Sequence, residues 1–265
     1  MILAHSDVGH ATRPGAPVLV FIHGFTCTRA DFAPQVEALA ARHRCIAVDL
    51  PGHGASAADG APAVAACARA VNETLDALGI DAAILIGHSM GCRVACEANR
   101  QSPQRVRGIV CIDGSRVLGE GVVERLAART ATPAGMADFL EGFNADFWVD
   151  SSPAAVRAAV AARLPGVDLA AARALLLDFV RWDQEDVIAA LQSVRAPMLV
   201  LQTTALDAAM KRVPIPPGTE TPWMAAIRAQ VRGARFTGIA KVGHFPMLEA
   251  PAATTAALAG FIETL

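Results

Sequence analysis

The chain has 265 residues, a length that excludes a disulfide-stapled mini-protein and suits one large α/β domain with an insertion. Hydrophobic residues make up 53% of it and charged residues 18%, so the composition excludes intrinsic disorder and allows a full buried core. Lysine and arginine number 23 against 25 aspartate and glutamate, and the formal charge of -2 is too weak to attract nucleic acid or an anionic membrane. The expected partner is therefore a small-molecule substrate.

The sequence also bears on the cellular compartment. Its longest bulky apolar runs fall far below the ~20 residues of a membrane span, and its first residues lack the charged and apolar regions of a secretory signal. Six cysteines are dispersed with no C-x-x-C pair, which indicates reduced thiols. No further ligand lies beside Cys92 and Cys96 in the sequence, so we expect them to pack in the core and expect no metal. These features predict a cytoplasmic protein and carry no signal for its oligomeric state.

Short apolar runs alternate with amphipathic stretches over most of the chain. The alternation predicts a mostly parallel sheet with helices on both faces, connected by right-handed crossovers. The expected strands span residues 18–22, 45–48, 83–86, 108–112, 198–201 and 235–239, and the expected helices span 32–42, 63–78, 90–100, 222–231 and 252–265.

One segment breaks this alternation. Between the strands that end at residue 112 and begin at residue 198, only helical periodicity is found, over far more residues than a crossover needs. We expect residues 115–196 to form a helical cap above the carboxyl ends of the strands, where open α/β sheets bind ligands. Residues 1–114 and 197–265 then form the α/β core.

The clearest chemical signal is the sequence Gly87-His-Ser-Met-Gly91, which follows a predicted strand and precedes a predicted helix. This is the G-x-S-x-G nucleophile elbow in the context that it requires. The backbone of such a serine is strained, and small residues two positions away on either side let strand and helix approach. We therefore expect Ser89 to be a nucleophile, with the Met90 N–H facing a developing oxyanion.

Two histidine motifs follow other predicted strands. In His23-Gly24-Phe25, the Phe25 N–H is the candidate second oxyanion donor, and His23 is expected to make a structural hydrogen bond. His244 lies just beyond the last predicted strand, about 155 residues after Ser89, and no other histidine follows the serine. A general base must come from a loop at the same edge of the sheet, so His244 is the expected base.

These motifs, together with 49–54, 197–201 and 243–251, resemble the α/β-hydrolase superfamily in family order over nearly the whole chain. The resemblance implies an α/β-hydrolase fold with a mostly parallel eight-stranded sheet, a helical cap, no cofactor and a nucleophile-acid-histidine triad. The amino end is short for this family, so the opening hairpin is predicted to be reduced to one strand near residues 1–5.

The acid of the implied triad has two candidates. The family usually takes it from the loop after the strand 198–201, where Asp207 lies one residue later than usual, and we favour it. Some members use a carboxylate after the strand that follows the nucleophile helix, and Asp113, 24 residues after Ser89, has that position. Either could accept the Nδ1–H of His244. Asp183 is a weaker third candidate and reads as a helix cap.

A serine at the elbow favours acyl transfer over chemistry that needs a carboxylate nucleophile. We expect hydrolysis of a small, largely apolar carboxylic ester, in a pocket to which Trp148, Trp182 and Phe245 contribute. Lys211 and Arg212, near the Pro-rich loop, could bind a carboxylate on the substrate, but we favour their interpretation as solvated surface charges. The alternatives are a thioester, lactone or C–C bond hydrolase, a cofactor-free oxygenase, or a non-catalytic ligand receptor on the same fold.

Overall fold

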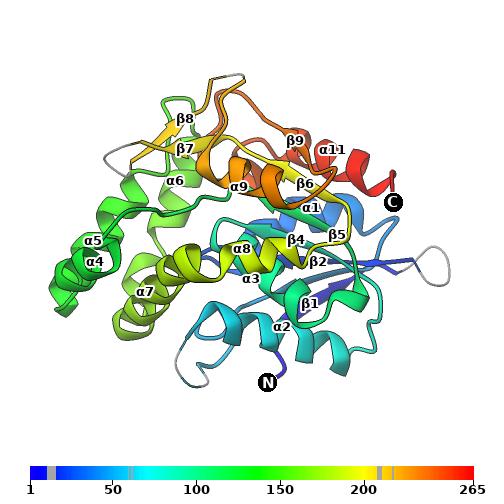
Figure 1. The fold of residues 1–265 in the computed structure, drawn as a ribbon, viewed down its shortest axis with the longest axis horizontal. Helices are drawn as coiled ribbons and strands as arrows, with labels where there is room; N and C mark the ends of the chain where they lie inside the picture. The colour runs from blue at the N-terminus through cyan, green and yellow to red at the C-terminus, as the bar shows by residue number, and fades with distance from the viewer. Residues whose placement is uncertain (11–15, 59, 61, 208–210, 217) are drawn as a thin grey trace.

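A computed structural model of the chain describes residues 1–265 except 11–15, 59, 61, 208–210 and 217. In the described part, seven strands form the central sheet in the order β1-β3-β2-β4-β5-β6-β9 (Figure 1). Strand β1 runs antiparallel to β3, and the other pairs are parallel. The strands of this sheet are β1 His5–Val8, β2 Val18–Ile22, β3 Cys45–Val48, β4 Ala83–His88, β5 Val106–Ile112, β6 Met198–Leu201 and β9 Arg235–Thr237.

The amino-terminal edge of the sheet accounts for a difference from the expected eight strands. Within the described residues a single strand precedes β2, at His5–Val8 rather than near residues 1–5. Two further strands, β7 Thr204–Leu206 and β8 Arg212–Pro214, pair only with each other in a separate hairpin. The mostly parallel α/β fold is as predicted.

The central sheet is buried on both faces, which explains why its strands read as continuous apolar runs. Along β2, Val20 and Ile22 face one core, while Leu19 and Phe21 face the other. The first core includes helices α2 Val64–Ala77, α3 Met90–Gln101, α8 Val187–Gln192 and α9 Pro222–Gln230, and the second includes α1 Ala33–Leu39, α10 Pro246–Glu249 and α11 Pro251–Ile262.

The insertion between β5 and β6 is helical, as its periodicity predicts. Helices α4, α5 and α7 lie together at one end of the sheet (Figure 1). Helix α8 also falls within residues 115–196, but it packs mainly against α3 and α9 of the core, with a smaller contact to α7. We use the name cap for the remaining four helices, α4 Val122–Arg129, α5 Pro133–Ala145, α6 Ala154–Ala161 and α7 Leu169–Glu185.

The carboxyl ends of four neighbouring strands meet at one edge of the sheet. The pairing register places Ile22 of β2 beside Gly87 of β4, and His88 of β4 beside Ile112 of β5. Ile112 in turn lies beside Leu201 of β6. The loops that leave these strands, which carry the predicted oxyanion, nucleophile and acid residues, therefore start side by side.

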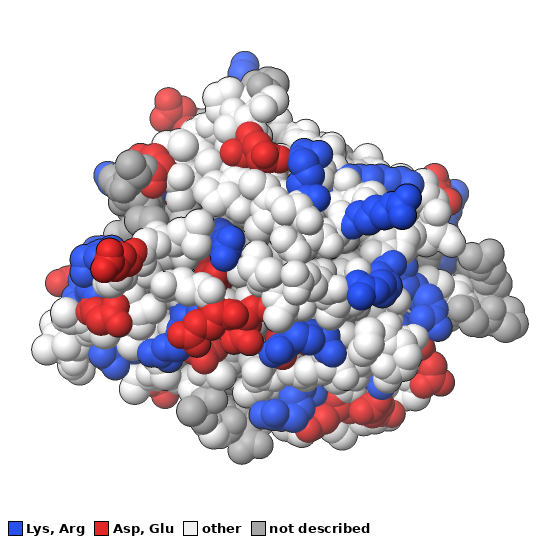
Figure 2. All heavy atoms as spheres, in the orientation of Figure 1, with Lys and Arg blue, Asp and Glu red and all other residues white. Residues whose placement is uncertain are grey.

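Among the described helices, none combines the length and apolarity that crossing a bilayer requires. Figure 2 shows both signs of charge scattered over the visible face, separated by wide uncharged areas.

The turn between β4 and α3 depends on close backbone approach. A Cβ on Gly87 would lie 2.2 Å from the carbonyl oxygen of Gly91, and a Cβ on Gly91 would lie 2.2 Å from that of Ile22. Between them Ser89 has φ 53° and ψ -116°, a conformation that L-residues rarely adopt. The predicted strain at the serine and the need for small neighbours are therefore both present.

Replacing Gly91 with alanine should lower the free energy of unfolding by about 1–3 kcal/mol, because the added methyl group collides with the backbone of β2. Gly260 is the matched control, since it lies in α11 with no atom within 4 Å of an added Cβ. Gly260→Ala should stabilise the protein by up to ~1 kcal/mol through helix propensity. Urea denaturation of both variants measures the difference, and equal effects would contradict the packing argument.

Candidate active site

Three side chains from separate loops form a hydrogen-bonded line at the strand ends. The Oγ of Ser89 lies 2.9 Å from Nε2 of His244, and Nδ1 of the same ring lies 2.7 Å from Oδ2 of Asp113. All three residues are buried. The arrangement has the geometry of a nucleophile, a base and an acid that orients the base.

Asp113, and not the favoured Asp207, is the carboxylate against His244. It directly follows β5, and its carboxylate accepts hydrogen bonds from the backbone N–H groups of Thr203 and Thr204 at 2.8 and 2.7 Å, and from the Thr204 hydroxyl at 2.6 Å. Asp207 lies instead in the exposed turn after β7, where it accepts from the Lys211 N–H at 2.9 Å. The physical reason is that β7 carries the chain away from the sheet edge into the β7–β8 hairpin.

The third candidate acid is also engaged elsewhere. Asp183 is buried in α7 and receives two hydrogen bonds from the guanidinium of Arg93, at 2.8 and 2.6 Å, and a third from the Val117 N–H. Burial raises the pKa of this carboxyl, and Arg93 opposes the rise. Asp183 is thus neither a helix cap nor a partner of His244.

The histidine loop is held from both sides. The His244 N–H donates to the carbonyl oxygen of Phe147 at 2.9 Å, and the His244 carbonyl lies 2.8 Å from Nε2 of His88. The carbonyl can only accept, so Nε2 of His88 carries the proton. Burial lowers the pKa of His88 to about 3, so this ring stays neutral. His88 therefore helps to fix the loop that carries His244.

The electrostatic surroundings keep the His244 ring unprotonated. Burial lowers its pKa well below the usual value, and the nearby cations Arg212 and Arg93 lower it further. A neutral imidazole with its Nδ1–H on Asp113 leaves Nε2 able to accept the hydroxyl proton of Ser89.

Of the two predicted oxyanion donors, Met90 lies within the elbow and Phe25 lies in the loop after β2. Met90 is the first residue of α3, where a backbone N–H has no partner within the helix. Phe25 follows Gly24, whose added Cβ would lie 3.1 Å from Cβ of Ser89. In the described part of the chain, neither N–H has a hydrogen-bond acceptor. Two backbone donors beside one serine can stabilise a developing negative charge.

The loop that carries Phe25 is fixed by His23, as the sequence predicts. Nδ1 of this ring lies 2.7 Å from the Gly24 carbonyl, and Nε2 accepts from the Leu50 N–H at 2.9 Å. Burial lowers the pKa of His23 to about 3, so the ring keeps its donor and acceptor roles. His23 thus supports the loop structurally.

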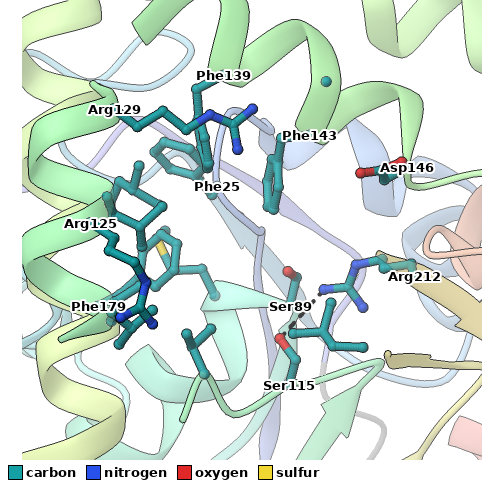
Figure 3. A pocket seen from close by; sticks show the side chains of 18 of the residues that line it. Phe25, Ser89, Ser115, Arg125, Arg129, Phe139, Phe143, Asp146, Phe179 and Arg212 are labelled. Atoms are coloured by element: carbon teal, nitrogen blue, oxygen red, sulfur yellow. Dashed lines mark hydrogen bonds between the residues drawn. The ribbon is translucent and has the colours of Figure 1, made fainter. Parts of the chain in front are cut away.

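A cavity of about 330 Å³ opens above Ser89 and beneath the cap (Figure 3). Its wall is mainly apolar and comes from the elbow and from α4, α5 and α7, with four arginines and one aspartate among the lining residues. The aromatic rings of the wall are Phe25, Phe139, Phe143 and Phe179.

The three residues predicted to line the pocket do not line this cavity. Trp182 is buried in the core against Glu97, and Phe245 is buried in the core beside the His244 ring. Trp148 stacks on Phe245 with ring centroids 5.3 Å apart. Periodicity identified large apolar residues in the cap but not the direction in which each one points.

Sequence reading missed the buried arginines of the cavity wall. Arg212, expected to be a solvated surface charge, is buried and donates to Asp113 at 3.3 Å and to Thr204 at 3.0 Å. Burial lowers its pKa to about 10. No sequence signal marks it, because the β7–β8 hairpin turns it inward. Arg93 lies four residues after Ser89, one turn along the nucleophile helix, and that spacing could have identified it.

Within the described residues, no three His, Cys, Asp or Glu side chains gather as a metal site would require. All six cysteines are buried with free thiols, and Cys92 and Cys96 belong to the core as expected.

Comparisons with known proteins agree on one family. The family described as "Alpha/beta hydrolase family" matches residues 19–258. The 2-(acetamidomethylene)succinate hydrolase of Mesorhizobium japonicum is 33% identical over 136 residues, which are 46% of this chain and 46% of that protein. The 2-succinyl-6-hydroxy-2,4-cyclohexadiene-1-carboxylate synthase of Salmonella paratyphi B is 38% identical over 104 residues, 38% of this chain and 40% of that protein.

Solved structures extend the likeness to the whole fold. The structure of a thermophilic esterase from Thermogutta terrifontis, with malate bound, has 25% sequence identity and a TM-score of 0.80. The superposition covers 99% of this chain and 93% of that chain. By contrast, the chain spans less than half of the length of the curated relatives that it matches.

Replacing Arg212 with methionine should raise the pKa of the His244 imidazole, because removing a nearby cation favours the protonated ring. In the unchanged protein the ring should stay neutral until the pH is well below 6.5. NMR titration of the His244 ring measures both. Arg212→Lys keeps the charge and should keep the low pKa, and Lys211→Met removes an exposed charge as a control. Identical titrations in all four proteins would contradict the electrostatic argument.

Proposed function

Because the chain belongs to the alpha/beta hydrolase family, we propose that it is a serine hydrolase that cleaves a carboxylic ester through an acyl-enzyme on Ser89. The observation that carries this proposal is the 2.9 Å contact between Ser89 Oγ and His244 Nε2, with the other ring nitrogen on Asp113. A hydroxyl on a strained turn, within hydrogen-bond distance of a neutral imidazole, is an activated nucleophile.

The first half of the proposed reaction forms the acyl-enzyme. Ser89 Oγ attacks the ester carbonyl carbon while His244 Nε2 takes the hydroxyl proton, and the carbonyl oxygen becomes an oxyanion. Asp113 stabilises the imidazolium that results. The proton then passes from Nε2 to the leaving alcohol as the C–O bond breaks.

In the proposed reaction, backbone N–H groups stabilise the oxyanion. We assign its two donors to the N–H groups of Phe25 and Met90. Both belong to segments fixed by close packing, so they need not reorganise during the reaction. In hydrolases of this kind one such donor stabilises the transition state by about 3 kcal/mol.

The second half regenerates the enzyme. A water molecule gives a proton to His244 Nε2 and attacks the acyl carbon, and the second oxyanion occupies the same donors. Its collapse returns the proton to Ser89 Oγ and releases the carboxylic acid. The low pKa of His244 supports both halves, because the ring must begin each one neutral.

The cavity supports a small and largely apolar substrate. Four phenylalanines contribute to its wall, and its volume of about 330 Å³ lies at the small end of ligand pockets. Two of the proteins to which the chain is similar are a hydrolase and an esterase by name. We propose ester hydrolysis rather than passive binding because a nucleophile, a base and an acid are aligned at the floor of the cavity.

A fluorophosphonate probe should label Ser89, and p-nitrophenyl esters of short acids should give a burst of p-nitrophenol followed by turnover. Ser89→Ala should abolish labelling and lower kcat by on the order of 10⁴-fold or more, because no other group replaces the nucleophile. Mass spectrometry of the labelled peptide and stopped-flow absorbance provide the measurements. Absence of both labelling and turnover, with thioesters and lactones included in the panel, would favour the ligand-receptor alternative.

The acid is tested by two asparagine variants. Asp113→Asn should lower kcat by on the order of 10⁴-fold, because the amide no longer holds His244 in the required tautomer or stabilises its charged form. Asp207→Asn, in the exposed turn after β7, should change kcat little. Steady-state kinetics with far-UV circular dichroism as a folding control separates the two. A large loss in Asp207→Asn alone would overturn the assignment.

A further inference from the structure

Several arginine side chains line the cavity above Ser89, although most of its wall is apolar. Four arginines are among the described residues that line it. Two of them, Arg93 of the nucleophile helix α3 and Arg212 of β8, lie near its floor, and the other two belong to helix α4 of the cap, as Figure 3 shows for Arg125 and Arg129. In the part of the chain that the structure describes, the only carboxylate that lines it is Asp146, just past α5. A small apolar substrate alone gives no reason for this set of cations.

The two arginines near the floor are neutralised by the protein itself. Arg93 forms a buried ion pair with Asp183 at 2.6 Å, and Arg212 forms one with Asp113 at 3.3 Å. Buried charges without such partners are strongly unfavourable, so both pairings are required for stability. These two cations therefore need no ligand to explain them.

The two arginines of α4 differ from that pair. Arg125 and Arg129 are four residues apart, so they share one face of the helix, and both line the cavity. The structure places no carboxylate within ion-pair distance of either one among the residues that it describes. The Arg125 guanidinium donates to the Glu120 carbonyl at 2.7 Å, and the Arg129 guanidinium lies over the Phe139 ring, 5.2 Å from its centroid.

Stability of the free protein does not account for this pair. Like charges four residues apart on a helix destabilise it by a few tenths of a kcal/mol. Both side chains are solvent-exposed, which keeps their donors open to a ligand. A guanidinium presents planar pairs of N–H donors that match a carboxylate. The Arg129 guanidinium lies over the buried ring of Phe139, and this contact limits the positions that it can occupy.

We propose that Arg125 and Arg129 bind a carboxylate on the substrate, so that this chain hydrolyses esters that also carry a free carboxylate. The inference rests on the proposed function. Ser89 lies at the floor of the cavity and α4 forms its outer wall, with Phe25 and Phe143 between them in Figure 3. The carboxylate and the scissile ester are therefore joined by an apolar spacer that packs on these rings.

Two series of activated esters test the proposal. One contains mono-p-nitrophenyl esters of adipic, pimelic and suberic acid, and the other contains neutral p-nitrophenyl esters of acids with the same chain lengths. The half-esters should have kcat/KM about tenfold or more above the neutral esters of matched length. The difference should lie in KM, because the carboxylate is bound equally in the ground state and the transition state. Added salt should raise KM for the half-esters only.

Substituting each arginine tests whether it causes the preference for half-esters. Arg125→Gln and Arg129→Gln should each reduce the preference for half-esters over neutral esters by about tenfold. Arg69→Gln removes an exposed arginine of α2 outside the cavity and should leave the preference unchanged. Equal kcat/KM for the two series, or equal effects of the glutamine variants on both, would refute the carboxylate site while turnover of the neutral esters upheld the proposed function.

A binding measurement separates the site from the chemistry. With Ser89→Ala, monomethyl adipate should bind more tightly than dimethyl adipate by calorimetry, and Arg125→Gln in that background should remove the difference. If no ester were turned over but this difference were present, the proposed function would fail and the carboxylate site would stand. Equal binding of the two adipates would refute the site whatever the kinetics show.

Discussion

The contact on which the structure depends is the approach of β4, α3 and β2 at one strained serine. The first residue of α3 follows Ser89 directly, and the helix packs so close to the sheet that no Cβ fits at Gly87 or Gly91. The turn that satisfies this packing forces Ser89 to a positive φ. A strained backbone of this kind persists only where many surrounding contacts hold it in place. Here two buried cores hold the sheet on both faces.

Beside this turn, a buried polar network holds the acid and the histidine in place. Asp113, His244 and Arg212 lie out of water, where unpaired polar groups would be costly. The backbone N–H groups of Thr203 and Thr204, at the start of the β7–β8 hairpin, satisfy the carboxylate. The hairpin thus supplies donors that hold the acid and also Arg212, a cation that adds to the effect of burial in lowering the pKa of His244. The proposed chemistry and the local stability depend on the same contacts.

Two of the three residues in the hydrogen-bonded line were predictable from local pattern. Ser89 lies in a motif whose spacing follows from the geometry of a strand-to-helix turn, and His244 was the only histidine after it. The acid was not predictable in this way. Asp113 and Asp207 both follow strands of the right type, and the choice depended on where a three-residue strand, β7, redirects the chain.

The amino-acid sequence by itself determined the alternation of buried strands and helices, the elbow and the helical insertion, because each of these depends on periodicity and spacing within a short window. Only the tertiary structure decided that Asp113 reaches His244, that Arg212 is buried, and that Phe139 rather than Trp182 lines the cavity. Those outcomes depend on the direction of single side chains between segments far apart in the chain. No local pattern encodes that direction, because it is set by how the loops pack against one another.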